Sequence, residues 1–290
     1  MKRVPAAATG ETRWPAPAKL NLFLHVTGRR ADGYHELQTL FQLLDLSDTI
    51  AIGVRADGEI ERPEGPEGVA AESDLAVRAA RALKAASGSP LGATLRVQKR
   101  IPQGGGLGGG SSDAATVLLA LNELWDLRLP QPELVSLARP LGADVPVFIE
   151  GFSAWGEGTG ERLTPVELPA RSYLILYPGV GVSTRQVFQS PELTRNSPLI
   201  TIRAFFESGG RNDCEAVVRA LCPEVGEALD WLGRFAPARL TGTGSCVFAA
   251  FASLAEAERL AARVPDRWRA TVARGLNVSP LRERLASHGQ

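Results

Sequence analysis

The stretch Gly104-Gly-Gly-Leu-Gly-Gly-Gly-Ser-Ser112 decides the fold, and the rest of the chain is interpreted outward from it. Six of its nine residues are glycine, and helical periodicity follows directly, from about residue 113 to 124. Glycine allows the backbone to approach a ligand closely and to adopt positive φ. The first turn of a helix presents unpaired N–H groups and the positive end of its dipole. Loop and helix together predict a phosphate-binding site.

Common nucleotide-binding motifs do not account for this loop. Gly104, Gly106 and Gly109 satisfy the dinucleotide pattern GxGxxG. In a run this rich in glycine, however, the pattern is expected to match by chance, and no regular βαβ unit surrounds it. A Walker A motif requires a lysine, and this loop contains none. The HRD and DFG motifs of protein kinases are also missing from the sequence. A flexible linker is less favoured, because linkers rarely run straight from a strand into an amphipathic helix.

The flanking segments predict an α+β protein in two domains. Strands are expected at 15–26, 37–46, 49–54, 95–97, 147–149, 153–155, 171–177, 246–251 and 271–273. Helices are expected at 74–86 with Ser73 as N-cap, after Pro132, and at 216–220, 226–235 and 254–263. Residues 56–68 resemble a surface loop. Because the elements follow no regular βαβ period, the class is α+β. A boundary near 158 divides 1–158, with 1–13 as a loose extension, from 159–290.

Composition excludes several classes of protein. The 290 residues carry 32 basic and 32 acidic side chains, so the basic footprint of a general nucleic-acid binder is missing. No apolar run approaches the roughly 20 residues of a membrane span. Three cysteines without CxxC spacing (Cys214, Cys222 and Cys246) argue against a disulfide framework and a zinc site. They indicate a protein of the reducing cytoplasm.

Two charged residues stand in apolar surroundings. Lys19 lies in the first predicted strand, and lysine is scarce here, since only 4 of the 32 basic residues are lysine. It is either a solvated strand residue or a cation facing a phosphate or a reacting hydroxyl. Asp144 directly precedes the apolar run 145–149. It is either a helix or turn cap or a general base that accepts a hydroxyl proton.

Two further segments allow a binding role. Gly33-Tyr34-His35 joins a turn to an aromatic ring and an imidazole, which could stack on a base and read its edge. An ordinary turn is the alternative. Thr241-Gly-Thr-Gly-Ser245 is a second small glycine loop, which either closes over a ligand or turns the chain.

Taken in order, these pieces resemble the GHMP kinase superfamily, which includes galactokinase, homoserine kinase, mevalonate kinase and phosphomevalonate kinase. The similarity is greatest to its branch that phosphorylates a cytidine diphosphate ester of methylerythritol, and it extends from about residue 14 to 281. The segments that carry it are Pro15-Ala-Pro-Ala-Lys-Leu-Asn-Leu-Phe-Leu24, Arg30-Ala-Asp-Gly-Tyr-His35, Leu37-Gln-Thr-Leu-Phe-Gln42, Ile101-Pro-Gln-Gly-Gly-Gly-Leu-Gly-Gly-Gly-Ser-Ser112, Leu141-Gly-Ala-Asp-Val-Pro-Val-Phe148 and Leu240-Thr-Gly-Thr-Gly244.

This resemblance implies a GHMP-kinase-like fold with the active site in the cleft between its domains. ATP and Mg2+ would serve as cofactors, with the N-terminal domain binding ATP. Lys19 and Asp144 match the family's catalytic pair. Tyr34, His35 and Phe188 match the groups that stack on and hydrogen-bond the cytosine, and Asn21 and Thr184 match substrate contacts. The ATP phosphate loop comprises Pro102, Gln103, Gly104, Gly105, Gly106, Leu107, Gly108, Gly109, Gly110, Ser111 and Ser112.

Some expectations stay open at this level. The metal ligand is unknown: Ser111, Ser112 or Asp113 could contact Mg2+, although Asp113 is better explained as a complement to the helix N-terminus. A kinase of a simpler alcohol, such as mevalonate or homoserine, is the runner-up function. A nucleotide-binding module without catalysis comes next, and an oxidoreductase is least favoured. Neither a nucleic-acid nor a membrane partner is expected, and the oligomeric state does not follow from the sequence.

Overall fold

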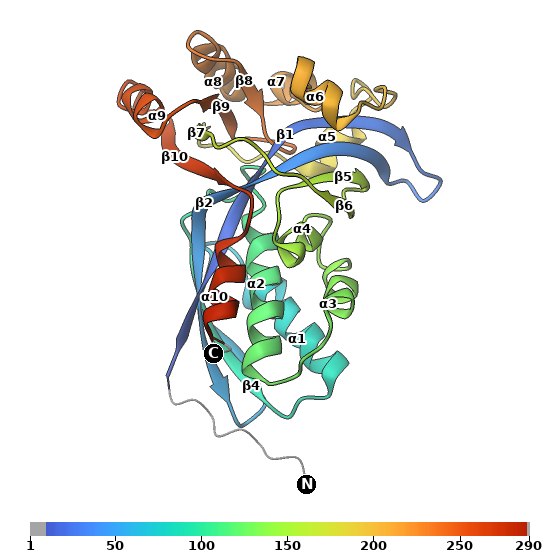
Figure 1. Cartoon of the computed structure of the whole chain (residues 1–290), viewed down its shortest axis with the longest axis vertical. Helices are drawn as coiled ribbons and strands as arrows, with labels where there is room; N and C mark the ends of the chain where they lie inside the picture. Colours follow the sequence, from blue (N-terminus) through green and yellow to red (C-terminus); the bar gives the residue numbers. More distant parts are fainter. Residues whose placement is uncertain (1–9, 289–290) are drawn as a thin grey trace.

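The computed structural model describes residues 10–288, which form an α+β fold around a 10-stranded sheet (Figure 1). Its main path runs β3-β4-β2-β10-β7-β9-β8, while β1 pairs with β2, and β5 pairs with β2 and β6. The strands are β1 (Thr12–Arg29), β2 (His35–Arg55), β3 (Ile60–Glu64), β4 (Gly92–Gln98), β5 (Ala154–Gly158), β6 (Arg162–Pro165), β7 (Ser172–Tyr177), β8 (Ala238–Leu240), β9 (Val247–Phe251) and β10 (Arg269–Leu276). The helices are α1 (Leu75–Ser87), α2 (Gly109–Leu124), α3 (Gln131–Ala138), α4 (Val145–Glu150), α5 (Thr184–Gln189), α6 (Ile202–Ser208), α7 (Glu215–Leu221), α8 (Pro223–Gly233), α9 (Leu254–Ala261) and α10 (Pro280–His288), with a short 3-10 turn at Ala71–Ser73.

Strand β2 connects the two halves of the molecule. One edge pairs antiparallel with β1, and the other is shared by β4, β10 and β5. The sequence predicts two strands here, separated at Ser47 and Asp48, and this is wrong. Asp48 is fully buried and accepts hydrogen bonds from the backbone N–H groups of Arg100 and Ile101, at 2.5 and 2.9 Å. Although aspartate favours turns, Asp48 therefore lies within a continuous strand and holds the backbone at Arg100 and Ile101.

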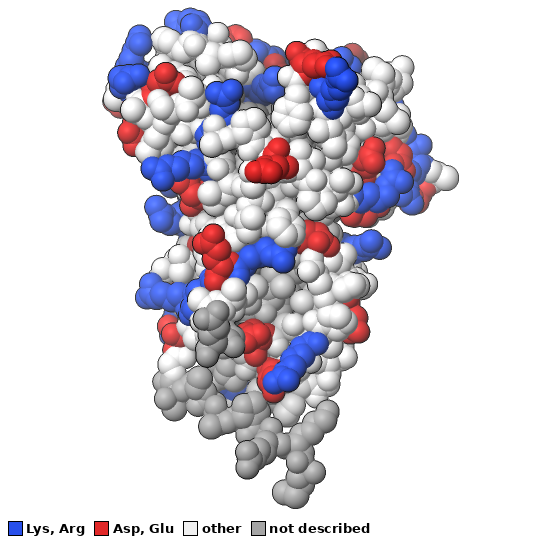
Figure 2. Space-filling model, in the orientation of Figure 1, with Lys and Arg blue, Asp and Glu red and all other residues white. Residues whose placement is uncertain are grey.

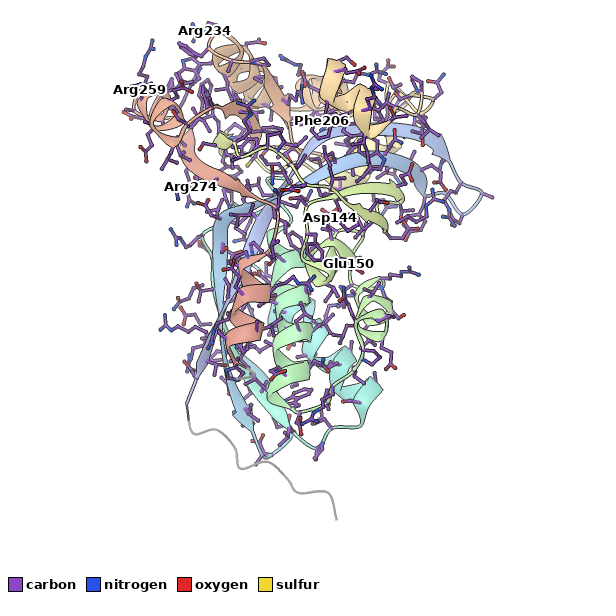
Figure 3. The ribbon with its side chains drawn as sticks, viewed as in Figure 1. Asp144, Glu150, Phe206, Arg234, Arg259 and Arg274 are labelled. Atoms are coloured by element: carbon purple, nitrogen blue, oxygen red, sulfur yellow. The ribbon has the colours of Figure 1, made fainter. Side chains whose placement is uncertain are left out.

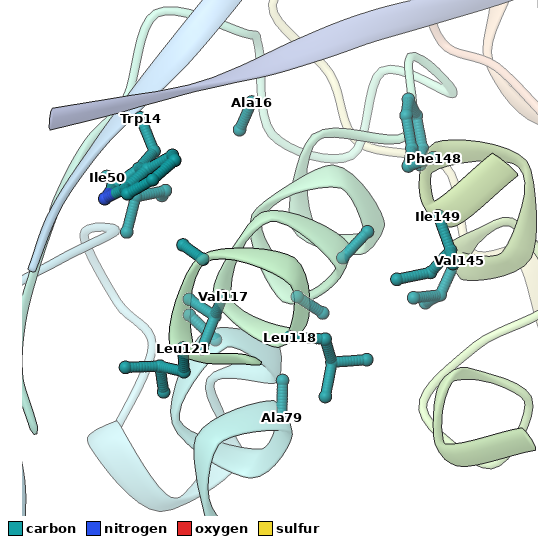
Figure 4. Packing of buried hydrophobic residues seen from close by; sticks show 14 of the residues in the cluster. Trp14, Ala16, Ile50, Ala79, Val117, Leu118, Leu121, Val145, Phe148 and Ile149 are labelled. Carbon is teal, nitrogen blue, oxygen red and sulfur yellow. The ribbon is translucent and has the colours of Figure 1, made fainter. Parts of the chain in front are cut away.

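Hydrophobic side chains gather in separate clusters on the two halves. The first lies between β1, β2 and β4 and the helices α1, α2 and α4 (Figure 4). Leu281 of α10 is 1% exposed and belongs to it, so the C-terminal helix packs against the first half of the chain (Figure 1). The second cluster lies between β7 and β9 and the helices α7, α8 and α9. The domain boundary near residue 158 stays a prediction.

Two helix predictions and one strand prediction require correction. Helix α2 begins at Gly109, four residues before the expected start, so the last residues of the glycine run are helical. Residues 147–149 are not a strand but part of α4, because a short apolar run does not distinguish a strand from a buried helix. The N-cap of α1 is Asp74, whose carboxylate accepts from the N–H of Ala76, and Ser73 lies in the preceding turn.

Two expectations on irregular segments also change. Residues 56–68 contain β3, which pairs parallel with β4. The loose extension ends earlier than residue 13, because Thr12 already pairs with Ile52; residues 1–9 lie outside the described part of the chain. Most other predicted strands and helices are confirmed, with ends that differ by a few residues.

Charge is spread over the molecular surface. Basic and acidic side chains are interspersed on the face shown in Figure 2, in keeping with a formal net charge of zero. Within residues 10–288, none of the helices has the length and apolar character needed to cross a membrane.

Candidate active site

The ammonium group of Lys19 lies among three oxygen atoms. Its Nζ donates to Asn21 Oδ1 at 2.5 Å and to the carbonyl of Gly106 at 3.0 Å, and it lies 3.0 Å from Asp144 Oδ2. The side chain is 2% exposed, so it is not a solvated strand residue. These three acceptors match the three donors of an ammonium group. Lys19 thus joins the first strand, the glycine loop and the start of α4 at one point.

Asp144 occupies the position before the first turn of α4, where it makes no side-chain cap (Figure 3). Asp144 is the N-cap residue of α4 by position, but capping does not account for its carboxylate. One third of its side chain is exposed, while its partner Lys19 is buried. A carboxylate held on one side by an ammonium group and open on the other can accept a proton from a bound hydroxyl.

The glycine loop requires glycine at the positions nearest to Lys19. Gly106 and Gly108 have φ of +75° and +74°, a region that L side chains rarely adopt. A Cβ on Gly106 would lie 2.3 Å from the carbonyl oxygen of Thr241. One on Gly108 would lie 2.9 Å from Phe148 and 3.1 Å from Cε of Lys19. The loop therefore packs directly onto the catalytic candidates.

The second glycine loop supports the first. Ser245 and Cys246 donate backbone hydrogen bonds to the carbonyls of Gly104 and Gly105, at 3.2 and 3.0 Å. Thr241 Oγ1 accepts the N–H of Asn21 at 2.9 Å. Thr241–Ser245 turns the chain between β8 and β9 and braces the glycine loop, while its closing over a ligand stays a prediction.

Two pockets meet at Gly106. The first, of about 250 Å³, is lined by the loop from Pro102 to Gly110, together with Lys99 and Asp113. The second, of about 270 Å³, brings together most of the predicted site: Lys19, Asn21, Gly106, Ser111, Asp144, Thr184 and Phe188. Ser112 is buried and lines neither pocket. Since Gly106 borders both pockets, a group could pass from one to the other beside Lys19.

The aromatic residues are only partly brought together. His35 stacks on Phe188, with ring centroids 5.0 Å apart. Thr184 contacts the second glycine loop through a hydroxyl–hydroxyl hydrogen bond of 2.8 Å to Thr243. Tyr34, in contrast, is 67% exposed at the turn between β1 and β2 and lines neither pocket.

Sequence reasoning missed Arg195, whose Nε donates to His35 Nε2 at 3.1 Å. It also missed a buried charge cluster beside the first pocket. Lys99 Nζ lies 2.5 Å from Asp48 and 2.6 Å from Asp113. The scarcity of lysine could have singled out Lys99 as it did Lys19, but no local pattern identifies its partners.

Asp113 belongs to this cluster and does not complement the helix N-terminus. Helix α2 starts four residues earlier and has no acidic residue in its first turn. Burial raises the pKa of Asp113 to about 7; Lys99 opposes this shift, and the nearby carboxylate of Asp48 adds to it. Burial by itself lowers the pKa of Lys99, but the two carboxylates outweigh it, so the pKa of the ammonium is raised. The cluster holds the end of β4 where it enters the glycine loop.

Family models match both halves of the chain. The model described as GHMP kinases N terminal domain matches residues 74–152, and the one described as GHMP kinases C terminal matches residues 192–270. The crystal structure of homoserine kinase from Cytophaga hutchinsonii has a TM-score of 0.67 at 16% identity, covering 94% of this chain and 97% of its own. That likeness concerns the fold alone.

Closer relatives share a single name. The 4-diphosphocytidyl-2-C-methyl-D-erythritol kinase of Halorhodospira halophila is 56% identical over 276 residues, 94% of this chain and 96% of the relative. The protein of the same name from Pseudomonas aeruginosa is 54% identical, and the match covers 93% of this chain and 96% of the relative. A crystal structure of 4-(cytidine 5'-diphospho)-2C-methyl-D-erythritol kinase has a TM-score of 0.80 at 37% identity and covers 91% of this chain and 99% of its own. The chain therefore belongs to the 4-diphosphocytidyl-2-C-methyl-D-erythritol kinase family of the GHMP kinases.

Proposed function

We propose that this small-molecule kinase transfers the γ-phosphoryl group of ATP to the 2-hydroxyl of 4-diphosphocytidyl-2-C-methyl-D-erythritol. The products are ADP and the 2-phosphate, in the non-mevalonate route to isoprenoid precursors. The relatives' shared name supports this substrate. The observation that carries the chemistry is the Lys19 ammonium, which bridges Asp144 and the carbonyl of Gly106 where the two pockets meet. We expect the reaction to take place in the cytoplasm, a reducing compartment that suits a chain whose three cysteines are unpaired.

In the proposed mechanism, ATP lies in the first pocket and the alcohol in the second. Asp144 accepts the hydroxyl proton as the oxygen attacks the γ-phosphorus. The new O–P bond forms while the bond from the γ-phosphorus to the β,γ-bridging oxygen breaks, and ADP leaves. Lys19 stabilises the negative charge that develops on the attacking oxygen. Phosphoryl transfer requires mainly positioning and electrostatic stabilisation from the protein, which the braced loop supplies.

The loop residues fit a magnesium ion that arrives with the nucleotide. Mg2+ typically binds one or two protein oxygens and completes its shell with phosphates and water. The Ser112 hydroxyl is buried near the start of α2 without a hydrogen-bond partner among residues 10–288, and the Ser111 hydroxyl lies on the preceding residue. Ser111, which lines the second pocket beside Gly106, would hold the ion, and Ser112 would join it only if its hydroxyl became accessible from a pocket. The ion would supply neutralisation of the phosphate charge.

The base of the substrate is assigned to the aromatic end of the second pocket. Phe188 lines the pocket, and the ring of His35 stacks on the ring of Phe188 just outside the lining. A planar base that reaches Phe188 would therefore have the imidazole as its neighbour. Tyr34 would have to turn inward from its exposed position to stack on the same base. Asn21 and Thr184 line the pocket between this end and Asp144 as polar contacts.

A coupled ATP-to-ADP assay with Mg2+ tests the function. The cytidyl substrate is compared with mevalonate and homoserine. ADP formation with the cytidyl substrate alone is the expected result. Turnover of a simple alcohol alone would retain the mechanism but contradict the roles given to Tyr34, His35 and Phe188. Nucleotide binding without turnover of any of the three would contradict the proposed substrate.

A further inference from the structure

Arg195 connects the two aromatic residues of the base-binding end. It lies in the segment after α5, and its Nε donates to His35 Nε2 at 3.1 Å. Its Nη2 donates to the carbonyls of Phe188 at 2.9 Å and Ser190 at 2.7 Å, and its Nη1 donates to that of Leu193 at 3.0 Å. One guanidinium thus holds the backbone around Phe188 and the imidazole that stacks on it.

This arrangement determines which imidazole nitrogen carries the proton. Arginine only donates hydrogen bonds, so His35 Nε2 must accept, and the proton of the neutral ring lies on Nδ1. Within residues 10–288, His35 Nδ1 has no hydrogen-bond partner, so this N–H remains available to a ligand. A histidine without such a partner would exchange between the two tautomers.

Burial and the surrounding charges favour the neutral form of the ring. Burial lowers the pKa of His35, and the positive charges of Arg195 and of Arg29 on β1 lower it further. The acidic neighbour on its own strand, Glu36, faces Arg30 at 3.6 Å. Protonation of Nε2 would also place two donors against each other, since Arg195 Nε–H already points at that atom.

We propose that Arg195 is a positioning residue that makes His35 a donor through Nδ1 and thereby selects cytosine over uracil in the substrate. Cytosine N3 accepts a hydrogen bond, whereas N3–H of uracil donates one, so an obligate donor accepts the first base and rejects the second. A site built around such a bond discriminates because the wrong ligand leaves a buried polar group unpaired. This inference rests on the proposed function only for the identity of the base.

The tautomer can be measured without any activity. The chain has only three histidines, His25, His35 and His288, so imidazole 15N spectra of the full-length protein are simple, and a His35→Gln variant assigns the signal. We expect His35 to carry its proton on Nδ1 at pH 8 and the Arg195→Met variant to show exchange between tautomers. A proton on Nε2 in the unchanged protein would overturn the proposal, whatever the substrate proves to be.

Kinetics test the consequence for the substrate. In Arg195→Met at pH 8, KM for the cytidyl substrate should rise about 10-fold, which corresponds to one lost hydrogen bond of about 1.4 kcal/mol. Both kcat and KM for ATP should stay within about 2-fold, and the preference over the uridine analogue should fall by about the same factor of 10. As the pH falls to 6, KM of the variant should recover relative to the unchanged enzyme, because an imidazolium ring carries a proton on both nitrogens.

Two further variants separate positioning from a damaged fold. Arg195→Lys retains a donor for His35 Nε2 and should keep the Nδ1–H tautomer and much of the preference for cytosine. Arg203→Met removes an arginine that is 88% exposed and pairs with Glu207, and it should change nothing. A KM increase in Arg195→Met that does not depend on pH, together with an unchanged preference between the bases, would show a merely structural role. Failure of the unchanged protein to turn over the cytidyl substrate would refute the proposed function and leave the tautomer result standing.

Discussion

At the scale of single residues, Lys19 and Asp144 form an unequal pair. The ammonium group is buried and uses all of its donors, whereas the carboxylate is partly open to the second pocket. The lysine is therefore a fixed element of the site, and the aspartate is the group available to an incoming hydroxyl. This asymmetry agrees with the roles proposed for them.

Asp144→Asn should lower kcat by about 10²- to 10⁴-fold, because the amide does not accept the hydroxyl proton. Nucleotide affinity should be nearly unchanged, because Asp144 lines only the second pocket. The coupled ADP assay and a calorimetric titration with ATP check the two parts. Asp126→Asn, which changes an aspartate that is 58% exposed, serves as the matched control. Turnover of Asp144→Asn equal to that of the control would remove Asp144 from the role of base.

Asp113 should make stability depend on pH. Its folded pKa of about 7 lies above the ordinary value of 3.8, so between these values the folded protein binds the proton more tightly than the unfolded chain. The contribution of Asp113 to stability is therefore present at low pH and lost as the pH rises toward 7. Asp113→Asn cannot ionise, and its free energy of unfolding relative to the unchanged protein should increase by on the order of 1–3 kcal/mol between pH 5 and 8.

Urea unfolding at pH 5, 6, 7 and 8 measures this difference. Asp126→Asn again provides the comparison, since its exposed side chain should give a constant offset over the same range. A constant offset for Asp113→Asn as well would contradict the raised pKa.

At the scale of elements, the site depends on two loops in contact. The glycine loop comes from the segment between β4 and α2, and the loop that braces it lies between β8 and β9. Their glycines allow carbonyls of each loop to approach the other closely, as at Gly106 and Thr241. The shape of the glycine loop is therefore determined jointly by both halves of the chain.

Gly106→Ala should disrupt this contact. The new Cβ would require φ of +75° and would lie 2.3 Å from a backbone oxygen, so the loss of stability should be at least about 2 kcal/mol. ATP affinity should fall with it. Gly233→Ala, at a helical position with nothing within 4 Å of the added Cβ, should be neutral or stabilising by up to about 1 kcal/mol. Thermal unfolding and ATP titration of both variants measure the contrast, and equal behaviour would disprove the steric argument.

At the scale of the whole molecule, two elements add to the loop contact that ties the halves together. Strand β2 pairs with strands of both halves, and α10 returns to pack on β1 and α2 (Figure 1). Lys19 and Asp144, the proposed catalytic pair, line a pocket to which both halves contribute residues. Loosening a distant part of the first hydrophobic cluster should therefore affect the stability of the entire fold.

Leu281→Ala tests this coupling. Its side chain is 1% exposed in the first cluster, and truncation of such a leucine costs about 2–5 kcal/mol. Leu199→Ala, at a position that is 67% exposed, should change stability by less than about 0.5 kcal/mol. Urea unfolding followed by circular dichroism should show the loss for Leu281→Ala alone. A similarly small effect at both positions would mean that α10 contributes little to the fold.

The sequence by itself determined the features that depend on neighbouring residues. Strong local patterns, such as the glycine run before α2 and the alternation of β1, identified elements because they restrict the backbone directly. The order of motifs along the chain was sufficient to identify the family. Lys19 and Asp144 could be selected because a charge in an apolar segment requires a reason wherever the segment folds.

Only the tertiary structure decided which distant groups meet. Asp48 joins Lys99 across 51 positions and Arg195 joins His35 across 160, and no local pattern encodes either pair. The same dependence explains the errors at Asp48 and in α4. Local propensity favours a turn at Asp48, and it does not distinguish a strand from a helix in α4. Burial against distant elements decides the structure at both places. Long-range packing outweighs local preference there. A buried polar group needs hydrogen-bond partners and a buried apolar run needs packing partners, and distant segments of the chain provide both.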